Sequence, residues 1–250
     1  MFQNIKSLAK ANLLFALLTI ISYAQAQQGD PKMTEIWEPQ PKIVTPGIAT
    51  GAPSDAIILF DGSDLSKWQH SDGKPAQWEV KDGIITVKPG TGVITTKQAF
   101  GDMQLHVEFR TPEKVEGESQ GRGNSGIIIQ GRYEVQVLDC YNNKTYSNGM
   151  IGSIYKQYIP LANACRKPGE WQTYDIIFTA PRFNDEGRAI VPANVTVLLN
   201  NILVQNHVDI LGTIQFIGLP KYEKHNLKEP LTLQDHGNLV SYRNIWVREL

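Results

Sequence analysis

Short β-rich runs separated by turn residues make up the chain from Ile57 onward. Asp61–Gly62, Asp82–Gly83 and Asn200–Asn201 stand between such runs, and these dipeptides favour tight hairpin turns. This region has no stretch with a sustained apolar period of about 3.6 residues, so the pattern does not favour amphipathic helices. Many short strands with Gly, Asn and Pro between them are typical of a β-sandwich or jelly roll. We therefore predict a single all-β domain.

The predicted strands alternate between apolar and polar residues. In the run 103–110, Met, Leu, Val and Phe occupy the odd positions and polar residues occupy the even ones. Successive side chains of a strand point to opposite faces, so each run should bury one face and turn the other outward. Other strands are expected at 57–60, 84–87, 171–179, 194–199, 202–205, 231–236 and 240–248.

A hairpin is predicted in the stretch 124–139, where an apolar run and an alternating run flank the break Gln130–Arg132. The alternating run places Tyr133 and two valines on one face, and Glu134 and Gln136 on the other. Residues on the same face are about 6.5 Å apart along the strand. A carboxylate and an amide presented together can hold a sugar, a metal ion or a proton. The rest of the chain is interpreted as a scaffold for this polar face.

The N-terminus has the pattern of a secretory signal peptide. Lys6 and Lys10 precede an apolar run at 11–24, which is short for a membrane span, and Ala24–Ala26 supplies small residues for cleavage. We therefore expect residues 1–26 to be a signal peptide and the mature protein to be periplasmic or secreted.

A Pro-rich leader is predicted at 27–56, because five prolines in this span disfavour both helix and central strand. Trp37 and Ile43 within it are too apolar for a free linker, so we expect the leader to lie along the domain surface. The β-sandwich domain is then expected at 57–250.

Charge and cysteine content limit the partners. The chain has 24 Lys and Arg against 25 Asp and Glu, and loss of Lys6 and Lys10 with the signal peptide changes the net charge from −1 to −3. No block of like charge is present, so we expect neither nucleic-acid binding nor membrane insertion after signal cleavage. Cys140 and Cys165 could pair in an oxidising compartment or remain buried thiols, and the sequence leaves both open.

Motifs of several enzyme classes are missing. The chain has no phosphate-binding loop, no His-Glu-x-x-His, no Cys-x-x-Cys and no Gly-x-Ser-x-Gly. If the strands share one curved sheet, their polar faces converge on a groove; the alternative is an outer face that simply meets water. The polar groups concerned are Glu134 with Gln136, Glu108 with His106 and Arg110, Gln234 with His236, and Arg243.

Glu134 and His236 stand out among these groups. Glu134 lies in a run that is otherwise too apolar for a solvated edge, and His236 is followed by a glycine that permits close approach.

Seven sequence blocks occur in a characteristic order. They are Leu59–Gly62 with Leu65 and Trp68, Asn124–Gly126, Tyr133–Asp139, Gly152–Tyr155, Gly169–Trp171, Gln234–Gly237 and Arg243–Ile245. With these blocks the chain resembles the 3-keto-disaccharide hydrolase family from about Ile57 to Leu250. Two departures are Gln172, where Asn is usual, and a longer, more charged segment at 183–192. The resemblance implies a secreted bacterial protein with a concanavalin A-like jelly-roll β-sandwich.

The resemblance also implies an activity, the cleavage of glycosidic bonds in 3-keto-disaccharides or 3-keto-glycosides. A ketone acidifies the neighbouring carbon–hydrogen bond, so a base can remove that proton and the anomeric substituent can leave by β-elimination. Water then adds back, which gives net hydrolysis. The route needs a base, a donor or metal for the enolate oxygen, and an acid for the leaving oxygen.

Roles for individual residues follow from the matching blocks. Glu134 and His236 are assigned to proton transfer or metal ligation. Asp139 is either a turn residue or a third ligand with them, since a histidine with carboxylates suits a divalent metal ion. The predicted substrate-binding residues are Gln136, Arg243, Asn124, Tyr155 and Glu108.

Two other functions remain as alternatives. A non-catalytic carbohydrate-binding jelly-roll module would bind sugars on aromatic platforms without chemistry. A laminarinase-like hydrolase would need two carboxylates flanking one bond. Glu134 has no acidic partner two residues away on its face, so we rank this alternative last.

Overall fold

The computed structural model describes residues 30–250, and the predicted signal peptide lies outside the described residues. The chain divides into two compact units, one ending at Ile43 and one spanning Val44–Leu250. The described part of the first unit contains the 3-10 helix η1 (Pro31–Thr34), whose preceding Asp30 carboxylate accepts a hydrogen bond from the Lys32 N–H. The second unit contains all strands of the described residues, and residues 44–56 of the predicted leader belong to it.

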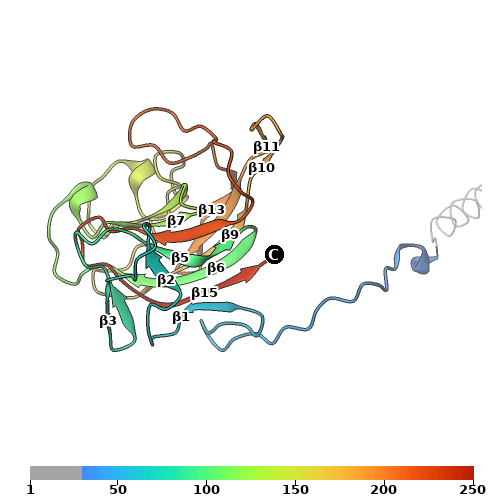
Figure 1. Ribbon diagram of the computed structural model, residues 1–250, viewed down its shortest axis with the longest axis horizontal. Helices are drawn as coiled ribbons and strands as arrows, with labels where there is room; N and C mark the ends of the chain where they lie inside the picture. Colours follow the sequence, from blue (N-terminus) through green and yellow to red (C-terminus); the bar gives the residue numbers. More distant parts are fainter. Residues whose placement is uncertain (1–29) are drawn as a thin grey trace, which may run out of the picture. The chain divides into compact units, whose positions relative to one another are not determined.

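Two antiparallel sheets form a sandwich in the second unit (Figure 1). The strands of the larger sheet are β1 (Ile57–Phe60), β3 (Glu79–Lys81), β4 (Ile84–Thr86), β6 (Met103–Arg110), β9 (Gln172–Thr179), β12 (Asn194–Leu199), β13 (Ile202–Asp209) and β15 (Ser241–Glu249). Their order is β13-β12-β9-β6-β15-β4-β3, and β1 also pairs with β15.

The smaller sheet has the order β2-β5-β14-β7-β8. Its strands are β2 (Trp68–His70), β5 (Ile94–Phe100), β7 (Ser125–Ile129), β8 (Tyr133–Val137) and β14 (Glu229–Leu233). A separate hairpin joins β10 (Arg182–Phe183) to β11 (Ala189–Val191), and the loops carry two short 3-10 helices, η2 (Ser119–Gly121) and η3 (Ser147–Gly149).

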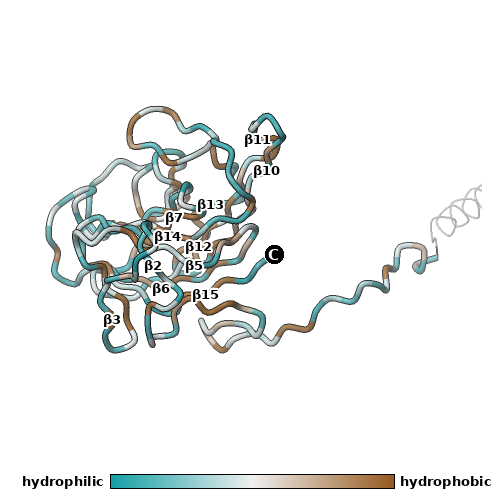
Figure 2. The backbone as a smooth tube through the Cα atoms, viewed as in Figure 1, coloured by the Kyte–Doolittle hydropathy of each residue, from teal (hydrophilic) through white to brown (hydrophobic). Residues whose placement is uncertain are grey.

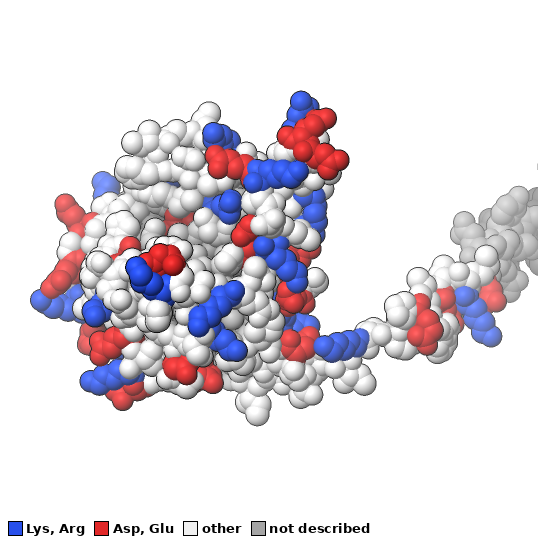
Figure 3. Space-filling model, in the orientation of Figure 1, with Lys and Arg blue, Asp and Glu red and all other residues white. Residues whose placement is uncertain are grey.

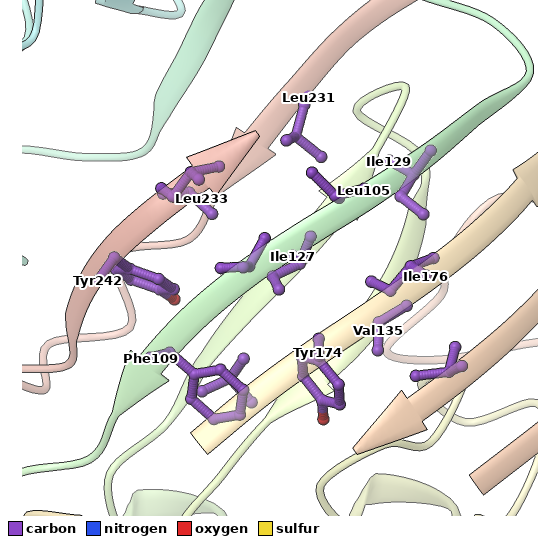
Figure 4. Packing of buried hydrophobic residues seen from close by; sticks show 14 of the residues in the cluster. Leu105, Phe109, Ile127, Ile129, Val135, Tyr174, Ile176, Leu231, Leu233 and Tyr242 are labelled. Atoms are coloured by element: carbon purple, nitrogen blue, oxygen red, sulfur yellow. The ribbon is translucent and has the colours of Figure 1, made fainter. Parts of the chain in front are cut away.

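The core lies between the two sheets. Aromatic side chains of the larger sheet, Phe109, Tyr174 and Tyr242, face aliphatic side chains of the smaller one such as Ile127 and Leu233 (Figure 4). All five are fully buried. Burial of each such side chain contributes about 1.5–3 kcal/mol, so this layer supplies most of the stabilisation that holds the sheets together.

The all-β jelly-roll sandwich predicted from the sequence is confirmed, and β1, β6 and β12 begin and end at the predicted residues. The strand expected at 231–236 is shorter, because β14 ends at Leu233. The Asp235 carboxylate explains the difference. It accepts hydrogen bonds from the backbone N–H groups of Gly90 and Gly92, at 2.8 and 3.0 Å, which draws the segment away from the ladder.

The predicted hairpin is the β7–β8 pair, in which Ile128 lies opposite Glu134 and Gly126 opposite Gln136. Gln130 and Gly131 both have positive φ, at 54° and 63°, and the Arg132 N–H donates to the Ile129 carbonyl. This is the geometry of a type I′ turn, whose twist matches that of the strands.

The described residues include no helix that is both long and apolar enough for a membrane span. Acidic and basic side chains are interspersed on the face shown in Figure 3. Cys140 and Cys165 are free thiols, and the Cys140 backbone N–H lies 3.4 Å from the Cys165 sulfur.

Candidate functional site

A pocket of about 260 Å³ opens on the outer face of the smaller sheet, away from the core. Five of its residues were predicted as site residues from the sequence: Asn124, Glu134, Gln136, Tyr155 and His236. The other three lining residues are Ile214, Phe216 and Gln234, which the predicted site did not include. Of these, only Gln234 carried a usable signal, since it shares a strand face with His236 in the sequence.

The chain after η3 places Tyr155 over the hairpin. Residues 152–155 run along the outer edge of β8, where the Tyr155 N–H donates to the Glu134 carbonyl and the Gln136 N–H donates to the Ser153 carbonyl, both at 3.1 Å. Because these bonds occupy the backbone of β8, this segment covers the strand's free edge. It thereby forms one wall of the pocket.

Gly126 makes room for the Glu134 side chain. The two residues belong to neighbouring strands, and a methyl group at position 126 would overlap the Glu134 Oε1 atom and lie 3.0 Å from Cδ. The backbone φ of Gly126 is not in the left-handed region, so the requirement is space and not conformation. The glycine in the Asn124–Gly126 block is therefore explained by the carboxyl group packed against it.

Glu134 is a buried carboxyl group with no basic partner among the residues that the structure describes. Its side chain is on the pocket floor, the residue is 3 % exposed, and no Lys or Arg is among the residues that line the pocket. Burial raises the pKa of Glu134 to about 8, because a charged carboxylate loses hydration there. Both protonation states are therefore accessible near neutral pH.

The Gln136 amide lies against the Glu134 carboxyl group. Its nitrogen donates to Glu134 Oε1 and to the Ser125 carbonyl oxygen, both at 3.1 Å. In the opposite orientation the amide oxygen would face these two acceptors, which it cannot satisfy. Gln136 therefore orients the Glu134 carboxyl group.

Several polar groups of the pocket are available to a ligand. Gln234 Oε1 is buried and has no hydrogen-bond partner among the described residues, so a ligand hydroxyl would satisfy it. His236 is exposed at the rim, and its ring has no partner among the described residues. The Tyr155 hydroxyl is 2.7 Å from that of Tyr146, and burial raises the pKa of Tyr155, so this group keeps its proton and can donate.

Glu108 and Arg243 do not lie in this pocket. They face each other on β6 and β15 of the larger sheet, where Arg243 Nε donates to Glu108 Oε2 at 2.6 Å. Asn244 and Thr50 donate to the other carboxylate oxygen, and the Arg243 guanidinium packs over Trp171 at 4.1 Å. The prediction that all the polar faces converge on one groove is therefore wrong for this pair. The outer faces of the two sheets point in opposite directions.

Asp139 is also engaged elsewhere. Its carboxylate forms a buried ion pair with Arg122, at 2.6 Å, and accepts the Tyr141 backbone N–H at 3.0 Å. The described residues include no group of three His, Cys, Asp or Glu side chains placed to hold a metal ion. The arrangement of Asp139 with Glu134 and His236 around one ion is therefore not formed.

Taken together, the pocket suits proton transfer to and from a neutral, hydroxyl-rich ligand. Glu134 offers a carboxyl group of shifted pKa, and His236 offers an imidazole at the rim. The amides of Gln136 and Gln234 and the Tyr155 hydroxyl supply hydrogen bonds around them. The lack of a basic lining residue disfavours an anionic ligand.

Comparison with known proteins identifies related chains. A family model described as a 3-keto-alpha-glucoside-1,2-lyase-like domain matches residues 55–248. A crystal structure from Parabacteroides distasonis, named as a candidate glycosyl hydrolase, is 55% identical with a TM-score of 0.85, and the match covers 88% of this chain and 96% of that chain. A search of curated proteins gives no match.

A second structure from Parabacteroides distasonis, also named as a candidate glycosyl hydrolase, shares the fold. It is 19% identical with a TM-score of 0.57, and the match covers 78% of this chain and 94% of that chain.

Proposed function

Because the chain belongs to the 3-keto-alpha-glucoside-1,2-lyase-like family, as its sequence blocks predicted, we propose that it cleaves glycosidic bonds in sugars that carry a ketone at carbon 3. The observation that carries the proposal is Glu134, a buried carboxyl group whose pKa is raised to about 8 in a pocket lined by neutral polar groups. A base of this strength suits removal of a proton next to a ketone, since basicity increases with pKa. We include in the proposal a periplasmic or secreted location.

Glu134 acts as the base in the proposed reaction. It takes the proton from carbon 2, and the electron pair moves onto the oxygen at carbon 3 to form an enolate. The Tyr155 hydroxyl donates to that oxygen, while the Gln136 amide holds the Glu134 carboxyl group in place. Donors aimed at developing charge in a site shielded from water lower the barrier without reorganising.

Departure of the anomeric substituent completes the elimination. The enolate re-forms the ketone, a double bond forms between carbons 1 and 2, and the bond from carbon 1 to the leaving oxygen breaks. His236 at the rim donates a proton to that oxygen. His236 then takes a proton from water as the hydroxide adds to carbon 1, and Glu134 returns its proton to carbon 2. These steps give the free 3-keto sugar and restore both residues.

The experiment compares a 3-keto glucoside with its unoxidised parent, each with and without a chelator. We expect cleavage of the 3-keto compound to be faster than cleavage of the parent by about 100-fold or more, because only the ketone acidifies the proton at carbon 2 that a general base can remove. Product release followed by chromatography measures both rates. Equal cleavage of the parent would indicate an ordinary glycosidase, and binding of the parent without cleavage of either would indicate a binding module. The chelator arm tests for a divalent ion.

Gly126→Ala should lower kcat/KM for the 3-keto glucoside by roughly 100-fold, because the added methyl group displaces the Glu134 carboxyl group from its position. Steady-state kinetics at pH 8 measure the change. The matched control is Gly121→Ala, where an added methyl group meets no atom within 4 Å and the φ is not positive. Unchanged kinetics in both variants would contradict the placement of Glu134 at the reacting carbon.

A further inference from the structure

The loop between β13 and β14 exposes an apolar tip beside the pocket. Phe216, Ile217 and Leu219 are 69 %, 82 % and 88 % exposed. In Figure 2 the outer part of this loop is coloured as hydrophobic. Three large apolar side chains this exposed and this close in sequence form a patch of the kind that marks an interaction site.

The base of the loop is held in place by hydrogen bonds. The Thr213 N–H donates to the Lys221 carbonyl at 2.9 Å, and the Ile214 N–H donates to the Arg132 carbonyl at 2.8 Å. The Lys156 ammonium donates to the Phe216 carbonyl at 2.7 Å and lies 4.2 Å from the centre of the Phe216 ring. The tip is therefore positioned and not free to leave the rim.

The patch is continuous with the pocket. Ile214 and Phe216 line the pocket, while Ile217 and Leu219 extend the same apolar surface outward. The floor, by contrast, is polar, with Glu134 and the unpartnered Gln234 Oε1. A ligand that satisfies both parts has hydroxyl groups at one end and an apolar group at the other.

We propose that the apolar tip is a leaving-group subsite that selects 3-keto glycosides with a flat, apolar aglycone; this proposal rests on the proposed function. The sugar ring occupies the polar floor, and at about 260 Å³ the pocket is small enough that the group on carbon 1 must project past the rim. There an aromatic group stacks on Phe216 and covers Ile217, which removes apolar surface of both molecules from water.

The test compares 2-phenylethyl 3-keto-glucoside with methyl 3-keto-glucoside. Both leaving groups are simple alcohols, so their intrinsic reactivity is similar and a difference reports binding of the aglycone. We expect kcat/KM to favour the 2-phenylethyl compound about tenfold in the unaltered full chain, mainly through KM. The double variant Phe216→Ala/Ile217→Ser should bring this ratio close to 1.

The matched control is Ile190→Ser on β11, which removes an equally apolar side chain that is 63 % exposed and does not line the pocket. This variant should keep the preference. A ratio near 1 in the unaltered protein, or a ratio that the double variant leaves unchanged, would overturn the subsite while leaving the proposed function intact. Failure to cleave either compound would overturn the proposed function and the subsite with it. If size-exclusion chromatography shows a dimer of the unaltered protein that the double variant loses, with the preference retained, the subsite is overturned and the tip is assigned to contact between two copies.

Discussion

Glu134→Gln should lower kcat/KM for a 3-keto glucoside by about a thousandfold, while the protein stays folded. The substitution keeps the size of the side chain and removes its capacity to accept the proton from carbon 2, and general base catalysis typically contributes 10²–10⁴-fold. Steady-state kinetics between pH 6 and 9 measure the loss. In the unaltered protein kcat/KM should rise with pH up to about 8, the raised pKa of Glu134, because the base must be ionised.

Glu108→Gln is the matched control for this experiment. Glu108 is also a buried glutamate, 5 % exposed, but it lies on the outer face of the larger sheet in contact with Arg243. Its replacement should leave kcat/KM within about twofold at a temperature where the variant is folded, since the side chain is remote from the reacting atoms. A thousandfold loss of kcat/KM in Glu108→Gln would place the reaction on the outer face of the larger sheet. A Glu134→Gln variant that keeps more than about a tenth of kcat/KM would contradict the role of Glu134 as the base.

The second large effect is a pH dependence of stability with opposite signs at the two glutamates. Burial raises the pKa of Glu134 from 4.5 to about 8, so the folded state holds a proton that the unfolded state releases. The stability that this proton contributes is present below pH 4.5 and is lost as the pH rises through 8. Between pH 4.5 and 8 the free energy of unfolding of Glu134→Gln should therefore increase relative to that of the unaltered protein, by at most about 5 kcal/mol.

Glu108 should show the reverse trend. Burial alone would raise the pKa of Glu108, but hydrogen bonds from Asn244, Arg243 and Thr50 lower it overall. Its ionised form therefore stabilises the fold above the unfolded pKa of about 4.5, and this contribution is lost as the pH falls through the lower folded value. Glu108→Gln should accordingly be less stable than the unaltered protein at pH 7, and the difference should shrink towards pH 3.

Urea unfolding at pH 3, 5, 7 and 9 measures both differences, because the free energy of unfolding extrapolates linearly to water. The key result is the change with pH and not the value at one pH, since any substitution in a buried site also alters packing. A Glu134→Gln difference that stays constant from pH 5 to 9 would show that the carboxyl group is ionised throughout, and would remove the basis for its role as a base with raised pKa.

The sequence alone predicted the sandwich and much of the hairpin site. Alternation in runs such as Met103–Arg110 reflects a local rule, since successive side chains of a strand must point to opposite faces. Turn residues such as Asn200 and Gly131 reflect a second local rule, because few residue types accept the positive φ that these hairpin turns require. Both rules act within a few residues, so the limits of β1, β6 and β12 and the shared face of Glu134 and Gln136 could be predicted from the chain itself.

Only the tertiary structure decided which polar faces meet. Alternation states that Glu108, Glu134 and Arg243 all point away from a core, but it does not state which sheet each strand joins. The pairing of β6 with β15 places two of them on one outer face, and the pairing of β7 with β8 places Glu134 on the other. Strand order results from contacts between residues far apart in the chain, and no local pattern encodes it.

The chemical character of Glu134 was decided in the same way. As a residue in an alternating strand it would meet water with an ordinary pKa. The segment with Tyr155 and the loop with Phe216 instead enclose it, and the resulting loss of hydration raises its pKa. The residue type and its strand face were thus determined locally, whereas its charge state and its partners depend on how distant loops close over the sheet.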